Sequence, residues 1–370
     1  MKIAYLLGSL NRGGTETLLL DVFKNASKAN FEFIGIHRKG GALQSDFYET
    51  KQNLFHLSPK FPFDIFYFYK LRKLLKKENV QIVHTQQYLD AFYAWVVTRF
   101  LDIKIIQTFH GFDHFDKKNR FISLISRLTN RNFYVSYFQK DYYTKKYKLN
   151  PAQQSVVYNG ISFDKLNEND KIPDFFEKIN SSQARLKMAM VGNFVRGREQ
   201  NCVCRFLKLL HNRNIAFDFY FVGKKNEAEP WRYDDCVQYC KENGLNDYVH
   251  FLGSRNDVPA ILKNIDAFVY STDHDTFGIA VIEAIAVGIP VFVNDWNVMK
   301  EITNNGEWAT IYRTKDEKNL FNKFLHFIEN KEQFKENALM AAKQVRKKFS
   351  IEEHIKSLYK NYQLVLQSRC

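Results

Sequence analysis

The sequence predicts an α/β protein built from two doubly wound domains, each with a parallel sheet. Short runs rich in β-branched and aromatic residues alternate with helical patterns, which is typical of parallel strands joined by crossover helices. The alternation restarts after the polar stretch 164–183, so we expect the domain boundary there. Three strands of the second half end just before a glycine, and ligands of open α/β sheets bind at such carboxyl ends.

The first half opens with an apolar strand at 2–7, which is followed by the glycine turn Gly13-Gly14. Leucine, valine and phenylalanine then recur at helical spacing over 15–24. The same patterns predict the next elements in order: a strand at 31–37, a helix around 71–75, a strand at 81–84, a helix at 91–100 and a strand at 103–109.

The second half restarts this alternation of strands and helices. The predicted strands lie at 186–191, 217–222, 249–252, 267–270 and 291–294. The predicted helices lie between them, at 202–212, 235–243, 258–264 and 280–286.

Composition excludes several classes of protein. The 370 residues include five cysteines, too few for a disulfide framework, and the pairs Cys202/Cys204 and Cys236/Cys240 lack zinc-site spacing. We therefore expect reduced thiols. No segment reaches the roughly 18 apolar residues of a membrane-spanning helix. The sequence predicts a soluble, cytoplasmic protein, either free or peripheral at the inner face of the cell membrane.

The net charge of +14 belongs almost entirely to the first half of the chain. Residues 1–160 carry 24 Lys and Arg against 12 Asp and Glu, whereas the remaining residues carry 30 against 28. This asymmetry indicates an anionic partner for the first half: a membrane surface, a phosphorylated substrate or nucleic acid. Because no recognisable nucleic-acid-binding module is present, we exclude nucleic acid.

Two segments of the first half place candidate ligand-binding residues after predicted strands. Gly13 and Gly14 open a helix, where backbone can approach a ligand closely and the helix N-terminus favours an anion. An ordinary strand-to-helix turn is the alternative. His110-Gly111 follows the strand at 103–109, so the histidine is expected at the ligand edge of the sheet. A structural hydrogen bond is the alternative for this histidine.

The second half contains clustered arginines and a pair of carboxylates. Gly192-Asn193 and the following Arg196 and Arg198 come after its first strand, where guanidinium groups can bind a diphosphate. A solvated surface loop is the alternative. Asp275 and Glu283 lie eight residues apart, one in a loop and one in a helix, with a glycine turn between them. Two acceptors placed in this way suit the hydroxyl groups of a sugar and of a ribose.

The segment from Asp275 through Glu283 to Pro290 resembles the E-x7-E signature of glycosyltransferase family 4. Members of that family are retaining enzymes of the GT-B architecture, in which two Rossmann-like domains face a central cleft. Further matches follow the family's order along essentially the whole chain: Gly13-Gly14, His84-Thr85, His110-Gly111, 157–161, 191–198, 249–259 and 349–362.

The resemblance implies an acceptor domain at 1–165, a donor domain at 183–349 and a final helix near 350–370 that returns to the first domain. A nucleoside-diphosphate sugar would bind the second domain, with Glu283 on the ribose, Asp275 on the transferred sugar, and Arg198 on the diphosphate. The resemblance implies that these three residues and His110 are the catalytic residues. The other implied donor contacts are Gly13, Gly14, Gly192, Asn193, Arg196, Gly253, Phe277 and Gly278. The acceptor hydroxyl would attack from the front face, without a cofactor or metal ion.

This chain departs from the family pattern at three positions. Asp275 stands where the signature has its first Glu, Asn193 where the family has Arg, and Gln86 where many members have a second His. These departures motivate an alternative function, a catalytically weak or inactive nucleotide-sugar-binding protein of the same fold. Asp273-His274-Asp275 also reads as D-x-D, a metal-binding motif of the other large glycosyltransferase fold. Its place inside the E-x7-E segment argues against a metal here.

The acceptor is predicted from a segment that mixes aromatic and basic residues, 60–77. Bulky aromatics beside Lys70, Lys73, Lys76 and Lys77 are typical of an amphipathic helix at a membrane surface. Further cations follow at Lys117, Lys118, Arg120, Arg127, Arg131, Lys145, Lys146 and Lys148. The alternative is an ordinary helix with a solvated basic face. The family resemblance and the basic first half favour a glycan or a polyprenyl-pyrophosphate-linked acceptor at an anionic membrane, in the synthesis of a surface polysaccharide.

Overall fold

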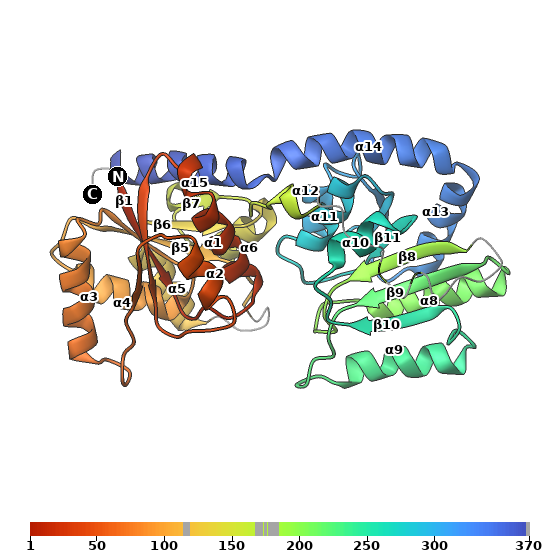
Figure 1. Cartoon of the computed structure of the whole chain (residues 1–370), viewed down its shortest axis with the longest axis horizontal. Helices are drawn as coiled ribbons and strands as arrows, with labels where there is room; N and C mark the ends of the chain where they lie inside the picture. Colours follow the sequence, from red (N-terminus) through yellow and green to blue (C-terminus); the bar gives the residue numbers. More distant parts are fainter. Residues whose placement is uncertain (114–118, 167–172, 174–175, 177–184, 368–370) are drawn as a thin grey trace. The chain divides into compact units, whose positions relative to one another are not determined.

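The computed structural model describes residues 1–113, 119–166, 173, 176 and 185–367. The chain forms two units, Met1–Ser162 together with Phe349–Cys370, and Phe163–Lys348 (Figure 1). Each unit has a parallel sheet with helices, which confirms the predicted fold class. Most of the stretch 164–183, where the sequence predicts the boundary, lies outside the described residues, as do Lys117 and Lys118.

The first unit contains a seven-stranded parallel sheet in the order β3-β2-β1-β4-β5-β6-β7. Its strands are β1 (Lys2–Leu7), β2 (Glu32–His37), β3 (Leu54–His56), β4 (Ile82–Thr85), β5 (Lys104–Phe109), β6 (Arg131–Tyr134) and β7 (Gln154–Val156). Its helices are α1 (Gly14–Lys24), α2 (Gln44–Glu49), α3 (Ile65–Lys77), α4 (Tyr88–Thr98), α5 (Arg120–Leu128), α6 (Tyr137–Tyr147) and α15 (Ile351–Gln367). The direction of winding reverses between β1 and β4, which is where ligands of such sheets bind.

The second unit contains a six-stranded sheet in the order β10-β9-β8-β11-β12-β13, and its winding reverses between β8 and β11. Its strands are β8 (Leu186–Val191), β9 (Phe217–Val222), β10 (Val249–Gly253), β11 (Ala267–Tyr270), β12 (Val291–Asn294) and β13 (Thr310–Tyr312). Its helices are α8 (Gln200–Asn212), α9 (Trp231–Glu242), α10 (Val258–Lys263), α11 (Ile279–Val287), α12 (Asn297–Ile302), α13 (Glu317–Glu329) and α14 (Lys331–Lys348).

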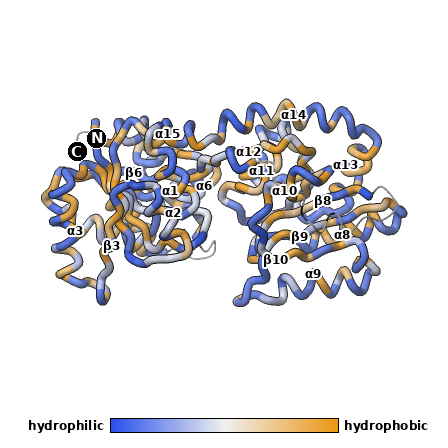
Figure 2. The backbone as a smooth tube through the Cα atoms, in the orientation of Figure 1, coloured by the Kyte–Doolittle hydropathy of each residue, from blue (hydrophilic) through white to orange (hydrophobic). Residues whose placement is uncertain are grey.

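The strands predicted from the sequence are present, because parallel strands covered on both faces need nearly continuous apolar runs. Figure 2 shows these runs of hydrophobic residues along the strands of both sheets. The sequence does not reveal β3, β6, β7 and β13, which have only three or four residues. Three of these four lie at the edge of a sheet, where one neighbour suffices. The predicted helix at 91–100 ends early, at Thr98, because Phe100 has a positive φ of 62°.

The C-terminal helix α15 packs on the sheet of the first unit, as the family resemblance implies. Ile351, Ile355, Leu358, Tyr362 and Val365 belong to the same buried cluster as residues of β1, α1 and β2. The hydroxyl of Tyr362 lies 2.6 Å from Nδ1 of His84 on β4 and 2.9 Å from the hydroxyl of Tyr5 on β1. Burial lowers the pKa of His84 well below its ordinary value, so this imidazole is neutral at physiological pH.

Among the described residues, none of the helices combines the length and the apolar composition needed to cross a membrane. The four cysteines at 202, 204, 236 and 240 are buried and free, in agreement with reduced thiols.

Candidate functional site

The candidate residues of the second unit gather at the carboxyl ends of β8 and β11, which are adjacent strands. β8 ends at Val191 and leads into the loop 192–199, while β11 ends at Tyr270 and leads into the loop 271–278. A backbone bridge between Arg198 and Thr272 joins the two loops. Adjacent strands therefore bring the predicted arginine and carboxylate loops together, although about 75 residues separate them in the sequence.

Gly192 and Asn193 form a tightly packed turn. A Cβ atom on Gly223, at the end of β9, would stand 2.1 Å from the carbonyl oxygen of Gly192, so a side chain there would collide with backbone. The side-chain oxygen of Asn193 accepts a hydrogen bond from the backbone N–H of Lys224 at 3.0 Å. Asn193 thus joins the ends of β8 and β9, and its place as a donor contact stays a prediction.

Arg198 and Asp275 form an ion pair. The hydroxyl of Tyr270 donates to the second oxygen of Asp275 at 2.5 Å, and the Arg198 guanidinium lies over the Tyr270 ring, 5.1 Å from its centroid. Arg198 also donates to the hydroxyl of Thr272 at 3.3 Å. Burial alone would lower the pKa of Arg198, but Tyr270 and Asp275 beside it raise the pKa above its ordinary value. The arginine is therefore firmly charged.

Both aspartates of the D-x-D segment pair with cationic side chains. Lys315, which follows β13, lies 2.7 Å from a carboxylate oxygen of Asp273 and 3.5 Å from one of Glu199. Burial, together with Asp273, raises the pKa of Glu199, while the hydrogen bond to Asp273 contributes to raising that of Lys315. His274, between the two aspartates, packs against Gly197, whose φ of +85° and lack of a Cβ permit the contact. Among the described residues no cluster of three metal-ligating side chains is found.

Glu283 lies on α11, a helix bounded by glycines in the left-handed conformation. Gly278 precedes the helix with φ +82° and Gly288 follows it with φ +89°. Phe277 is buried and anchors the turn, whereas Glu283 is only half-buried between buried neighbours. Gly253 ends β10 with φ +66° and open space around its Cβ position. Glu283 and Gly253 are therefore each partly exposed, and their contacts with a donor stay predictions.

In the first unit, the Gly13-Gly14 turn caps the amino end of α1. Gly13 is extended, with φ −151°, and neither glycine has a positive φ, so backbone strain does not explain them. A Cβ on Gly14 would meet nothing within 4 Å. A Cβ on Gly13 would instead stand 2.6 Å from a carboxylate oxygen of Glu16, in the first turn of the helix. The open space at the amino end of α1 is therefore beside Gly14, and the binding of an anion there stays a prediction.

His110 follows β5 and pairs with Gln86, which follows β4. Its Nε2 lies 2.7 Å from the side-chain oxygen of Gln86, so we assign the proton to Nε2. Burial, with the nearby His354 as a second cause, lowers the pKa of His110 to about 4. The imidazole is therefore neutral at pH 7. The glutamine that replaces the family's second histidine acts as its hydrogen-bond acceptor.

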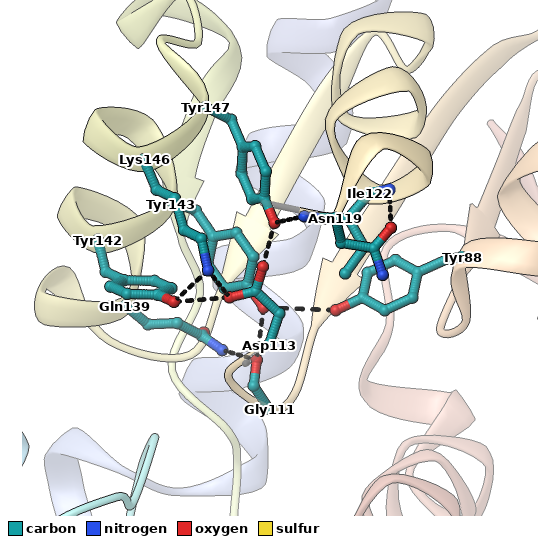
Figure 3. A network of polar contacts seen from close by, with 10 residues as sticks. All are labelled: Tyr88, Gly111, Asp113, Asn119, Ile122, Gln139, Tyr142, Tyr143, Lys146 and Tyr147. Atoms are coloured by element: carbon teal, nitrogen blue, oxygen red, sulfur yellow. Dashed lines mark hydrogen bonds and ion pairs between the residues drawn. The ribbon is translucent and has the colours of Figure 1, made fainter. Parts of the chain in front are cut away.

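A polar network holds the segment that follows His110 (Figure 3). The carbonyl of Gly111 accepts from Gln139 at 2.9 Å and from the hydroxyl of Tyr143 at 3.0 Å. Asp113 forms an ion pair with Lys146 at 2.9 Å and accepts hydrogen bonds from the hydroxyls of Tyr142 and Tyr147. α6 supplies these donors, so this helix fixes the backbone on which His110 is carried.

Sequence reasoning missed several residues that build the second unit's site. Thr272 lies in the loop 271–278, and Tyr270, Asn294, Trp296 and Lys315 each contact that loop. Lys315 also contacts Glu199 of the other loop. Only Tyr270 carries a local signal, because it is the last residue of an apolar strand just before the carboxylate segment. Lys315 follows β13, a strand that the sequence does not reveal.

Two family models together match most of the chain. Residues 12–165 match Glycosyltransferase Family 4, and residues 171–348 match Glycosyl transferases group 1. The chain is 26% identical over 239 residues to an Escherichia coli UDP-Gal:alpha-D-GlcNAc-diphosphoundecaprenol alpha-1,3-galactosyltransferase, with 61% of each chain covered. The match therefore spans less than two thirds of that relative. The chain is 24% identical to the Staphylococcus aureus capsular polysaccharide biosynthesis glycosyltransferase CapH, covering 77% of this chain and 78% of the other.

Solved structures show the same fold. A glycosyltransferase from Rickettsia africae superimposes with a TM-score of 0.85 at 19% identity, covering 100% of this chain and 99% of the other. Anabaena Alr3699/HepE in complex with UDP-glucose superimposes with a TM-score of 0.83 at 16% identity, covering 98% and 100%. Together with the two sheets and the E-x7-E segment, these findings show that the chain belongs to the group 1, family 4 glycosyltransferases and has the GT-B fold.

Proposed function

We propose that the protein is a retaining, metal-independent glycosyltransferase that moves a sugar from a nucleoside-diphosphate sugar to a hydroxyl of a glycan or polyprenyl-pyrophosphate-linked acceptor. The observation that carries this proposal is the meeting of Arg198 and Asp275 at the carboxyl ends of β8 and β11, beside α11 with Glu283. Family membership gives the reaction class. The names of the relatives, which include capsule and lipid-linked galactosyl transfer, support a role in the synthesis of a surface polysaccharide.

Residues of each unit have a proposed task. Glu283 accepts hydrogen bonds from the ribose hydroxyls, and the base lies near Gly253. Arg198, assisted by Arg196, stabilises the negative charge that grows on the leaving diphosphate, which is usually the largest catalytic contribution of such a site. In the first unit, neutral His110 and the amino end of α1 bind sugar and phosphate groups of the substrates. The departing diphosphate takes the proton of the acceptor hydroxyl, which attacks from the same face.

Metal independence is supported by the pairing of both aspartates in the D-x-D segment. Asp273 is paired with Lys315 and Asp275 with Arg198, so a divalent cation would have to displace an ammonium and a guanidinium group. Fixed cationic side chains instead provide the positive charge for the diphosphate.

The exposed part of α3 and the loop before it support a membrane-associated acceptor. Tyr67, Leu71 and Leu75 are buried, whereas Ile65 and Phe66 are each 77% exposed. Phe61, Phe63 and Tyr69 are also exposed, and Lys70, Lys73, Lys76 and Lys77 add positive charge to the same helix. Exposed aromatics beside cations are typical of a surface that binds an anionic bilayer. We propose that this surface holds the protein at the inner face of the cell membrane.

The donor assignment is tested by nucleotide binding in excess EDTA. UDP is the first probe, and GDP and ADP follow in the same thermal-shift screen, since a ligand of the native state raises its stability. Glu283→Ala should weaken binding of the active nucleotide by roughly 1–3 kcal/mol, or about 5- to 150-fold, because a charged hydrogen bond is lost. Glu336→Ala, an exposed glutamate on α14, is the control and should bind normally.

Unchanged affinity in Glu283→Ala would reject its role on the ribose, and loss of binding in EDTA with rescue by Mn²⁺ would reject metal independence. Stabilisation by a nucleotide sugar without turnover on any glycan or lipid-linked acceptor would favour the inactive binding protein. The anomeric configuration of the product, read by NMR, tests retention.

Membrane binding is expected to depend on charge. Wild-type protein should bind vesicles rich in phosphatidylglycerol far more than phosphatidylcholine vesicles, and less as salt rises, because each cation contributes about 1 kcal/mol near an anionic surface. Replacing Lys70, Lys73, Lys76 and Lys77 with Gln should remove most of this binding. The same change at Lys331, Lys335, Lys343 and Lys347 of α14 is the matched control and should have little effect. Equal binding to both kinds of vesicle would contradict the electrostatic proposal.

A further inference from the structure

Both carboxylate oxygens of Asp275 are engaged by side chains of the protein itself. One oxygen pairs with the guanidinium of Arg198, and the other accepts a hydrogen bond of 2.5 Å from the hydroxyl of Tyr270, which is only 1% exposed. The backbone is fixed as well, because the indole N–H of Trp296 donates to the carbonyl of Asp275 at 2.9 Å. Asp275 is therefore held from three sides, and its side chain is 13% exposed.

The guanidinium of Arg198 has partners at Nη1 but, within the described part of the chain, has no hydrogen-bond acceptor at Nε. Its Nη1 contacts Thr272 and Asp275, and its plane lies on the Tyr270 ring. Its Nε is buried and has no hydrogen-bond acceptor among the described residues. This Nε lies 3.2 Å from the position that a Cβ on Gly192 would occupy, so it is close to the glycine turn. An unpartnered buried donor destabilises the site, and an anionic oxygen that accepts its hydrogen bond would remove that cost.

We propose that Asp275 is a positioning residue for Arg198, not a ligand of the transferred sugar, and that Tyr270 holds Asp275 in this role. This inference rests on the proposed function and deepens it: the carboxylate and the phenol orient the guanidinium toward the donor's diphosphate at Gly192. The shorter side chain at the first position of the E-x7-E segment then has a physical reason. An aspartate reaches Arg198 and Tyr270, whereas sugar selection falls to other residues.

The test compares UDP with UMP, whose affinity ratio measures the contribution of the β-phosphate. Asp275→Asn should lower this ratio at least tenfold and leave UMP binding unchanged. Removal of the negative charge of Asp275 would by itself strengthen the binding of the anionic β-phosphate. A smaller contribution of the β-phosphate in Asp275→Asn would therefore show that Arg198 has lost its orientation. Tyr270→Phe, which keeps the ring under Arg198, should lower the ratio severalfold. Arg198→Met should lower it as well, and adding Asp275→Asn to that variant should cause no further loss.

Tyr312→Phe is the matched control, because it deletes another fully buried hydroxyl of the same sheet, one that donates to the carbonyl of Tyr270 at 2.9 Å. Its UDP-to-UMP ratio should equal that of the wild type. If Asp275→Asn does not fold, Tyr270→Phe carries the test.

An unchanged ratio in both variants, or a lost preference between UDP-glucose and UDP-galactose with normal UDP binding, would overturn the inference and restore Asp275 as a sugar ligand. If the wild type binds none of UDP, GDP and ADP, the proposed function itself fails. The two failures are therefore distinguishable.

Discussion

Replacing Tyr362 by alanine is expected to destabilise the first unit by about 3–5 kcal/mol, because a fully buried aromatic ring is lost and a cavity is left. The ring packs edge-on against Phe31 and near Phe133, and its hydroxyl contacts His84 and Tyr5. Tyr362 comes from the last helix of the chain, so this residue ties α15 to the sheet. Its removal should open β1 and β4 together with α15.

Hydrogen exchange read by mass spectrometry measures this effect unit by unit. Peptides from β1, β4 and α15 should lose protection in Tyr362→Ala, while peptides from β8 and β11 keep it. Tyr362→Phe should cost about 1–3 kcal/mol, because the ring stays but His84 and Tyr5 lose a buried partner. Gln363→Ala, the exposed neighbour, should change stability by less than about 0.5 kcal/mol. A loss below about 1 kcal/mol in Tyr362→Ala would show that α15 does not belong to this core.

Gly223→Ala is expected to abolish tight nucleotide binding while leaving most of the fold intact. Its Cβ would stand 2.1 Å from the carbonyl oxygen and 2.5 Å from the carbonyl carbon of Gly192, and 2.9 Å from the nitrogen of Asn193. Backbone atoms cannot rotate away as a flexible side chain can, so the 192–199 loop must shift. Overpacking of this kind costs about 1–3 kcal/mol, and moving Arg198 by about 1 Å is expected to cost a further hundredfold in activity.

The measurement is UDP affinity by calorimetry together with the midpoint of thermal unfolding. Gly244→Ala is the matched control, because this glycine has φ +68° but open space around its Cβ position. The control should lose roughly 1–2 kcal/mol of stability from backbone strain and keep its nucleotide affinity. A UDP affinity in Gly223→Ala equal to that of the wild type would mean that the turn at Gly192 does not bind the donor nucleotide.

The buried strands and their order along the chain could be predicted from local patterns. β8, β9, β11 and β12 have the predicted bounds, because strands covered on both faces leave an unmistakable apolar run. Of the edge strands, β3, β7 and β13 could not be predicted, whereas the longer β10 could. Three-residue strands such as β3 and β13 carry too little pattern and are stabilised by the neighbour they pair with.

The sequence by itself determined which residues stand at the carboxyl ends of the strands: His110 after β5, Gly192 after β8, and the Asp275 segment after β11. It could do so because a strand end is a local feature, marked by an apolar run that stops at glycine or polar residues. Only the tertiary structure decided which of these residues meet. β8 lies beside β11, so Arg198 pairs with Asp275, and Lys315 arrives from β13 to pair with Asp273. Such pairs depend on the order of strands in the sheet, which long-range packing sets and no local pattern contains.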